Sequence, residues 1–285
     1  MVVISATLFG CKKFGDTPIE FGKVQKDLPS FMSIYNFATD KTTSANFMLT
    51  TNSGLGITDT LKYFNINING TFTNKDSRLN EAGQTNYFNN IAVEPFIPPV
   101  ITNEILGYNK DFAWQQAGSL FGTELKLKLH RGAANAIGDT AVDYNAGYSP
   151  EVFICTNNFS NMYSYANGEY GGGPKLKPTY IINWNADTLN KNGVFVYVEY
   201  DPNAFGNAAL VSTHPTRVCN AVMVIDNGSY TLTSELFDQI PLNAYLSVYM
   251  GRGNFQYIKH NDGTLTDMQM TVLTYQYGNL YYKID

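Results

Sequence analysis

The stretch Tyr180-Ile181-Ile182-Asn183-Trp184-Asn185, followed by Val194-Phe195-Val196-Tyr197-Val198-Glu199-Tyr200, decides the fold class. Both runs are rich in β-branched and aromatic residues, which favour extended backbone on a pleated, half-buried surface. Asn192-Gly193 lies between them, and both residue types tolerate the positive φ angles of a tight turn. We therefore predict a β-hairpin whose two strands are residues 180–185 and 194–200.

Alternating apolar and polar residues extend this pattern into the N-terminal half. Residues 61–72 alternate Phe and Ile with Asn, and residues 123–130 alternate Leu with Lys. A period of two residues predicts strands with one buried face. Further strands are predicted at residues 45–50, 221–225, 229–232, 244–250, 254–258 and 268–275, with turns at Asn227-Gly228, Asp262-Gly263 and Gly278-Asn279.

The length and composition fit an all-β protein of two β-sandwich domains with long loops and little helix. The chain has 285 residues, enough for two domains of ordinary size. Charged residues make up only 15% of it, whereas there are 20 tyrosines, a balance that suits sheets better than exposed helices. We expect a leader at residues 1–10, a tether at 11–30, an N-terminal sandwich at 31–148 and a C-terminal sandwich at 149–285.

The N-terminus has the pattern of a lipoprotein leader. Residues 2–10 carry no charge and end in Leu8-Phe9-Gly10 directly before Cys11, and an apolar stretch this short cannot span a bilayer. The stretch resembles the lipobox of bacterial lipoproteins, which implies cleavage before Cys11 and acylation of that residue. Residues 11–17 are similar to the mature starts of Bacteroidetes-type envelope lipoproteins. The resemblance implies a protein anchored by lipid to the bacterial cell envelope, at the outer membrane.

The rhythm of strands and turns in residues 180–250 resembles an immunoglobulin-like or fibronectin-like sandwich. Trp184 in an early strand, the long hairpin and Pro241 before the final strand carry this likeness. It implies a fold but no function, because such sandwiches serve many unrelated functions.

No motif predicts catalysis, a metal or a cofactor. His130, His214 and His260 lie far apart without the spacing of zinc ligands, and residues 118–122 miss the Gly-x-Ser-x-Gly pattern by one position. The net charge of −5 argues against a nucleic-acid partner, which requires a basic surface. The sequence therefore favours a protein that is not an enzyme and binds neither a metal nor a cofactor.

One loop has residue types suited to sugar binding. Tyr163, Tyr165 and Tyr170 supply flat faces for stacking, while Asn167 and Glu169 supply polar contacts for hydroxyl groups. The alternative is an ordinary exposed loop.

Three functions remain open from the sequence. The first is a non-enzymatic, lipid-anchored envelope protein that binds a glycan or a surface protein through sandwich loops. The second is a structural subunit of a surface or pilus-like assembly, in which an edge strand accepts a strand from another chain. The third is a polysaccharide-acting hydrolase, whose two carboxylates cannot be selected by spacing among 24 acidic residues.

Cys155 and Cys219 remain as a pair once Cys11 is assigned to the lipid. A disulfide between them would persist in an oxidising compartment. It would close a loop of about 65 residues, worth about 4 kcal/mol in the chain-entropy model. The alternative is two separate buried thiols, because free cysteine packs as a small apolar residue.

Overall fold

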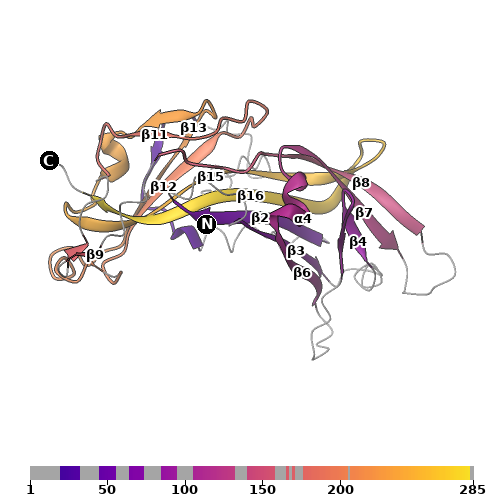
Figure 1. Ribbon diagram of the computed structural model, residues 1–285, viewed down its shortest axis with the longest axis horizontal. Coiled ribbons are helices and arrows are strands. Elements are labelled where there is room, and N and C mark those ends of the chain that lie inside the picture. Colours follow the sequence, from indigo (N-terminus) through magenta and orange to yellow (C-terminus); the bar gives the residue numbers. More distant parts are fainter. Residues whose placement is uncertain are drawn as a thin grey trace.

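A computed structural model describes most of the chain, and the described part is mostly β, with more than half of its residues in strands (Figure 1). The helical turns with full bounds are short: α4 (Trp114–Ala117), η3 (Gly118–Leu120) and η5 (Ser234–Phe237). No helix in the described part of the chain is long and apolar enough to cross a membrane. The described residues are 20–32, 45–55, 64–73, 85–94, 105–131, 140–157, 165–166, 169–170, 176–204 and 206–282.

A long C-terminal hairpin organises the molecule. β15 (Ala244–His260) and β16 (Leu265–Tyr282) pair antiparallel along almost their whole length and run across the molecule from one end to the other (Figure 1). The predicted turn at Asp262-Gly263 joins them, and Gly263 has a positive φ of 85°. The predicted turn at Gly278-Asn279 is wrong, because Gly278 pairs with Val248 inside the ladder. The hydrogen bonds of the ladder override the local turn preference of these two residues.

Twelve strands form one large curled sheet. β12 (Val194–Tyr200), β13 (Val218–Val224) and β1 (Val24–Gln25) branch from the first half of β15. β16 pairs with β2 in parallel, and the other strand pairs are antiparallel. The remaining strands follow the order β5 (Ile91–Val93), β4 (Asn86–Phe88), β7 (Thr123–Arg131), β8 (Thr140–Ser149), β15, β16, β2 (Ala45–Gly54), β3 (Asn65–Thr73), β6 (Ile105–Ala113).

The mostly-β expectation is confirmed; the two-sandwich architecture is not confirmed, because one large curled sheet runs through both halves of the described chain. β15 pairs with β12 through residues 246–252 and with β8 at residues 259–260, so the same strand belongs to both halves. At 17 and 18 residues, β15 and β16 are long enough to carry one continuous sheet through both. Each half still has its own core: three leucines of residues 125–129 belong to the N-terminal one, and alternate residues of β12 belong to the C-terminal one.

The predicted hairpin of residues 180–200 is wrong in its pairing. β11 (Ile181–Asn183) pairs with β14 (Ser229–Thr231), whereas β12 lies between β13 and β15. The reason lies in the connection between them, where the polar side chains of Asp187 and Asn190 are buried. A two-stranded hairpin would leave these side chains without the partners that they have here.

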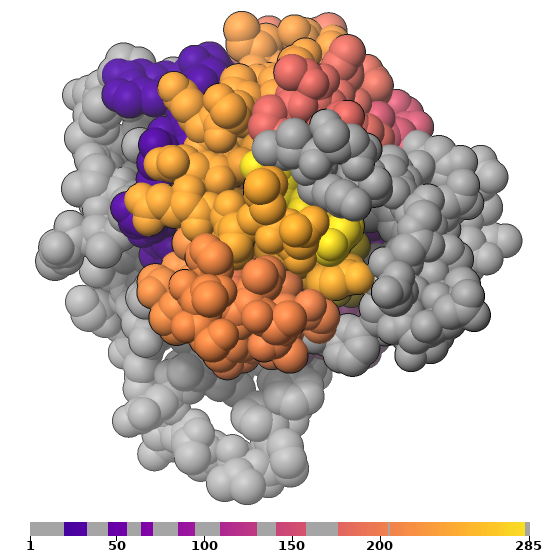
Figure 2. Space-filling model, turned by 90° about the vertical axis from the view of Figure 1, so that its left-hand side faces the viewer, coloured from indigo at the N-terminus to yellow at the C-terminus, as the bar shows by residue number. Residues whose placement is uncertain are grey.

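Residues 20–32, which we call the strap, are packed onto the C-terminal half. The sequence predicts a tether over residues 11–30, yet within residues 20–30 β1 pairs with β13 and Leu28 is buried. Figure 2 shows the indigo N-terminal residues lying against the orange surface of the C-terminal half. Any tether that follows Cys11 is therefore shorter than the sequence suggested.

Candidate functional site

One face of the C-terminal half is lined by tyrosines instead of aliphatic side chains. Because side chains alternate across a strand, every second residue of β15 and β16 points to this face. The register brings Tyr245 opposite Tyr281, Ser247 opposite Asn279 and Tyr249 opposite Tyr277. We call these six residues the tyrosine face. The sequence carries a signal for it, the period-two runs Tyr-x-Ser-x-Tyr and Tyr-x-Asn-x-Tyr at residues 245–249 and 277–281.

The tyrosine face is ordered by cross-strand contacts. The rings of Tyr245 and Tyr281 lie 4.9 Å apart, and those of Tyr249 and Tyr277 lie 6.1 Å apart at an angle of 21°. Between these pairs the hydroxyl of Ser247 donates a hydrogen bond of 3.0 Å to Oδ1 of Asn279. Because a strand rises about 3.4 Å per residue, the two ring pairs are about 14 Å apart. The face therefore alternates aromatic and polar groups along the two strands.

The tyrosine face is accessible to a ligand. The side chain of Tyr277 is 49% exposed, Asn279 is also exposed, and Tyr245, Ser247 and Tyr281 are half-buried. Yellow atoms of β16 reach the surface at the end of the molecule seen in Figure 2. The face thus combines preformed geometry with access from outside.

A second aromatic group adjoins the tyrosine face and is filled by the strap. Phe31 stacks on Tyr249 with ring centroids 4.2 Å apart and an angle of 16°. The rings of Phe195, Tyr197 and Tyr275 surround it at 5.6, 5.7 and 5.2 Å. We call these four residues (Phe195, Tyr197, Tyr249 and Tyr275) the cage. Tyr249 belongs to both the cage and the tyrosine face, so the two are continuous.

A buried carboxylate lies at the border of the cage. Glu199 is opposite Ser247 in the β12–β15 ladder, and its Oε2 accepts a hydrogen bond of 3.4 Å from the backbone N–H of Phe31. Its Oε1 lies 3.4 Å from Nε of Arg217, which also donates a 2.6 Å bond to Asp201. Burial raises the pKa of Glu199, while the positive charge of Arg217 opposes this shift. Glu199, Arg217 and Asp201 therefore place charged side chains beside the aromatic rings of the cage.

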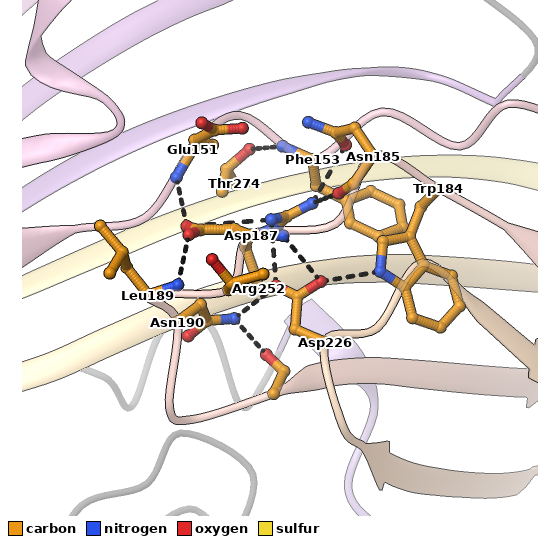
Figure 3. Close-up of polar contacts among 12 residues, drawn as sticks. Glu151, Phe153, Trp184, Asn185, Asp187, Leu189, Asn190, Asp226, Arg252 and Thr274 are labelled. Carbon is orange, nitrogen blue, oxygen red and sulfur yellow. Dashed lines mark hydrogen bonds and ion pairs between the residues drawn. The ribbon is translucent and has the colours of Figure 1, made fainter.

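A buried ion cluster lies where the two halves meet, and we call it the clasp (Figure 3). Arg252 of β15 is fully buried, and its Nη1 lies 3.0 Å from Oδ2 of Asp226 and 3.9 Å from Oδ2 of Asp187. Its guanidinium also lies 5.5 Å from the ring centroid of Phe153, a cation–π contact. Burial lowers the pKa of Arg252, and the carboxylate of Asp226 opposes this shift most strongly.

Further hydrogen bonds close the clasp. Trp184 Nε1 and Asn190 Nδ2 donate to the two oxygens of Asp226 at 2.8 and 2.9 Å. The hydroxyl of Tyr148 donates to both oxygens of Asp187 at 3.0 Å. Nη2 of Arg252 donates to the backbone and side-chain oxygens of Asn185. Because its charges are buried and paired by the protein, we assign the clasp a structural role.

The loop expected to bind sugar is described only in its backbone. Tyr165–Ala166 forms β9 and Glu169–Tyr170 forms β10, and the two strands pair as a small hairpin. Tyr163 and Asn167 lie outside the described residues, and so does the expected lipidation site, Cys11. The structure thus leaves the loop and the lipid anchor as predictions.

The two cysteines considered for a disulfide are not bonded to each other. Cys155 and Cys219 are both free and buried. Cys155 packs in the core of the C-terminal half together with Val218 and Val222 of β13, whereas Cys219 points to the opposite face of that strand, toward the cage. A sheet therefore separates the two thiols. Burial raises the pKa of Cys155 to about 12 and that of Cys219 to about 11, so neither is an activated nucleophile.

The described histidines lie apart. His260 packs against the ring of Tyr144, and Nδ1 of His214 lies 2.9 Å from the hydroxyl of Thr213. The described residues contain no group of three or more His, Cys, Asp or Glu side chains arranged to hold a metal ion.

No protein-family model matches this sequence, and no curated protein matches it. The chemistry of the tyrosine face is therefore the main guide to function.

Proposed function

We propose that this protein is a non-enzymatic, lipid-anchored envelope protein that binds a glycan on the tyrosine face. The observation that carries the proposal is the tyrosine face itself: Tyr277 is exposed, Tyr281 is half-buried, and Ser247 and Asn279 are hydrogen-bonded to each other between the aromatic rings. The site thus moves from the sandwich loops expected from the sequence to the face of the long hairpin.

The residue types of the face match the chemistry of a sugar chain. A pyranose ring has an apolar C–H side that packs on an aromatic ring, and its rim carries hydroxyl groups that need donors and acceptors. Tyrosine offers both with few rotatable bonds, so little conformational entropy is lost on binding. The two tyrosine pairs, about 14 Å apart, suit a short oligosaccharide lying along the strands.

Rigidity favours the face over a loop as the binding site. The tyrosines stand on paired strands, whose register fixes their spacing before any ligand arrives. A preformed surface of this kind avoids the cost of ordering a loop on binding.

Tyr277→Ala and Tyr281→Ala should each weaken binding of a glycan hit about two- to tenfold, since one aromatic contact contributes about 0.5–1.5 kcal/mol. The hit comes from a glycan-array screen, and its affinity is measured by calorimetry. Tyr257→Ala is the matched control, because Tyr257 lies on β15 about 27 Å from Tyr249 and should not affect affinity. Unchanged affinity in both face variants would contradict the proposed site, and a chain that binds no glycan would contradict the function.

The lipid anchor rests on the pattern that ends in Leu8-Phe9-Gly10-Cys11. Cys11→Ala should abolish acylation and release the protein from the membrane fraction, because the acylated residue is lost. Membrane partitioning and the mass of the N-terminal peptide measure this. An N-terminal peptide without lipid in the wild-type chain, together with unchanged partitioning of the variant, would overturn the anchor while leaving the glycan proposal standing.

A further inference from the structure

The strap occupies a groove that resembles a peptide-binding site. The groove is formed by the edge of β13 and by the cage, and the strap crosses both. Along the edge, the strap makes backbone hydrogen bonds from Gly22 N–H to the carbonyl of Met223 at 2.8 Å and from Leu28 N–H to the carbonyl of Cys219 at 3.0 Å. Between them, Val24 and Gln25 pair with β13 as β1. The strap thus acts as an added strand.

Side chains anchor the strap at defined points. Phe31 fills the cage, and Leu28 is buried in the same cluster. Tyr197 donates a hydrogen bond from its hydroxyl to the carbonyl of Pro29. Nζ of Lys26 lies 2.8 Å from Oδ2 of Asp238, and both of these side chains remain substantially exposed. Three kinds of side chain therefore select the occupant: the aromatic ring of Phe31, the aliphatic side chain of Leu28 and the cation of Lys26.

A groove with these requirements selects a specific sequence. An occupant must have a short extended segment that pairs with β13, a cation opposite Asp238, an aliphatic residue near Cys219 and an aromatic ring in the cage. Residues 24–31 of this chain meet all four requirements, with Val24 and Gln25 paired to β13 and a positive φ of 57° at Asp27. The occupant that best fits from another molecule is therefore the same segment of a second copy.

We propose that copies of this protein exchange straps, so that the strap of one molecule fills the groove of another. Every contact of the strap would be kept in the exchanged pair, so the exchange loses little binding energy. Residues 33–44 link the strap to β2, and a chain of twelve residues reaches at most about 40 Å. An empty groove would expose the edge of β13 and four aromatic rings of the cage, a surface that readily takes up another strand.

The exposed ion pair makes the exchange measurable in the unaltered chain. Full-length protein labelled with ¹⁵N and unlabelled protein are mixed in equal amounts, unfolded together and refolded. A zero-length carbodiimide reagent then joins Lys26 to Asp238, and mass spectrometry identifies whether each linked peptide pair is mixed or comes from one isotope. Full exchange should give about half mixed pairs, and sedimentation should show a dimer or a larger assembly.

An internal control lies within the strap itself. Lys23 and Glu20 form an ion pair of 2.6 Å on the same segment, so their link must always be of one isotope. Mixed Lys26–Asp238 links, with unmixed Lys23–Glu20 links, support strap exchange. Lys26–Asp238 links of one isotope only would show that each strap stays on its own body and would overturn the proposal. Absence of this link while the control link forms would equally overturn it, because the strap would then not lie in the groove.

Discussion

Replacing Arg252 by methionine is expected to lower the free energy of unfolding by about 3–5 kcal/mol. The change removes the only cation within 4 Å of Asp226 and Asp187 in the described part of the clasp. Both carboxylates would stay buried without their counter-charge, and a buried unpaired charge is far more costly than the lost attraction alone. Equilibrium unfolding in urea, followed by circular dichroism, measures the loss.

Two comparisons separate the charge from the loss of packing. Lys23→Met is the matched control, because the side chains of Lys23 and of its ion-pair partner Glu20 are both exposed, so this variant should lose about 1 kcal/mol or less. The double variant Arg252→Met with Asp226→Asn should recover part of the stability, since one buried negative charge is removed as well. Equal losses in the Arg252 and Lys23 variants would contradict the assignment of the clasp as a structural ion cluster.

The clasp could not be found from the sequence, because its members come from separate segments. Tyr148 lies in β8 and Arg252 in β15, whereas Asp187 and Asp226 follow β11 and β13, and no spacing pattern links the four residues. Their contact depends on β11 pairing with β14, which leaves residues 184–190 free to turn inward. The sequence pattern instead predicted a hairpin over these residues. A local turn signal at Asn192-Gly193 cannot reveal that a nearby loop will bury its polar groups.

Local patterns nevertheless predicted many strands correctly. The alternation of residues 123–130 matches β7, whose leucines are buried and whose lysines are exposed. The tyrosine runs of β15 and β16 have the same period of two. The period alone does not predict that the two runs face each other, because their register is set by the whole ladder between the two strands. Gly251, Gly253 and Gly278 interrupt the apparent pattern, and the continuous ladder of the hairpin overrides them.

Long-range pairing explains the remaining difference between the sequence prediction and the fold. β2 pairs in parallel with β16, joining Ala45 to Met268 across most of the chain. A pairing between strands so far apart in the sequence cannot be predicted from local patterns, because the residues around one strand do not indicate which strand is its partner. The sequence therefore predicted the class of structure and several strands, but not the single sheet that unites the two halves or the docking of the strap.

Phe31→Ala should lower the free energy of unfolding by about 3–5 kcal/mol, the usual cost of removing a buried phenylalanine ring. Phe31 is only 2% exposed and contacts all four rings of the cage, so its removal leaves an apolar cavity. Met32→Ala is the matched control: this neighbour is 48% exposed and its variant should stay within about 0.5 kcal/mol of wild type. Phe31→Leu should fall between them, because an aliphatic side chain fills part of the space.

The measured order of these three variants tests how the strap is held. A small loss in Phe31→Ala, close to that of Met32→Ala, would mean that the cage does not stabilise the strap. A large loss would mean that the folded C-terminal half depends on an occupant in the cage, since four aromatic rings are otherwise exposed to water. In that case the edge of β13 and the cage behave as one site that must be filled, whether by the strap of the same molecule or by that of its neighbour.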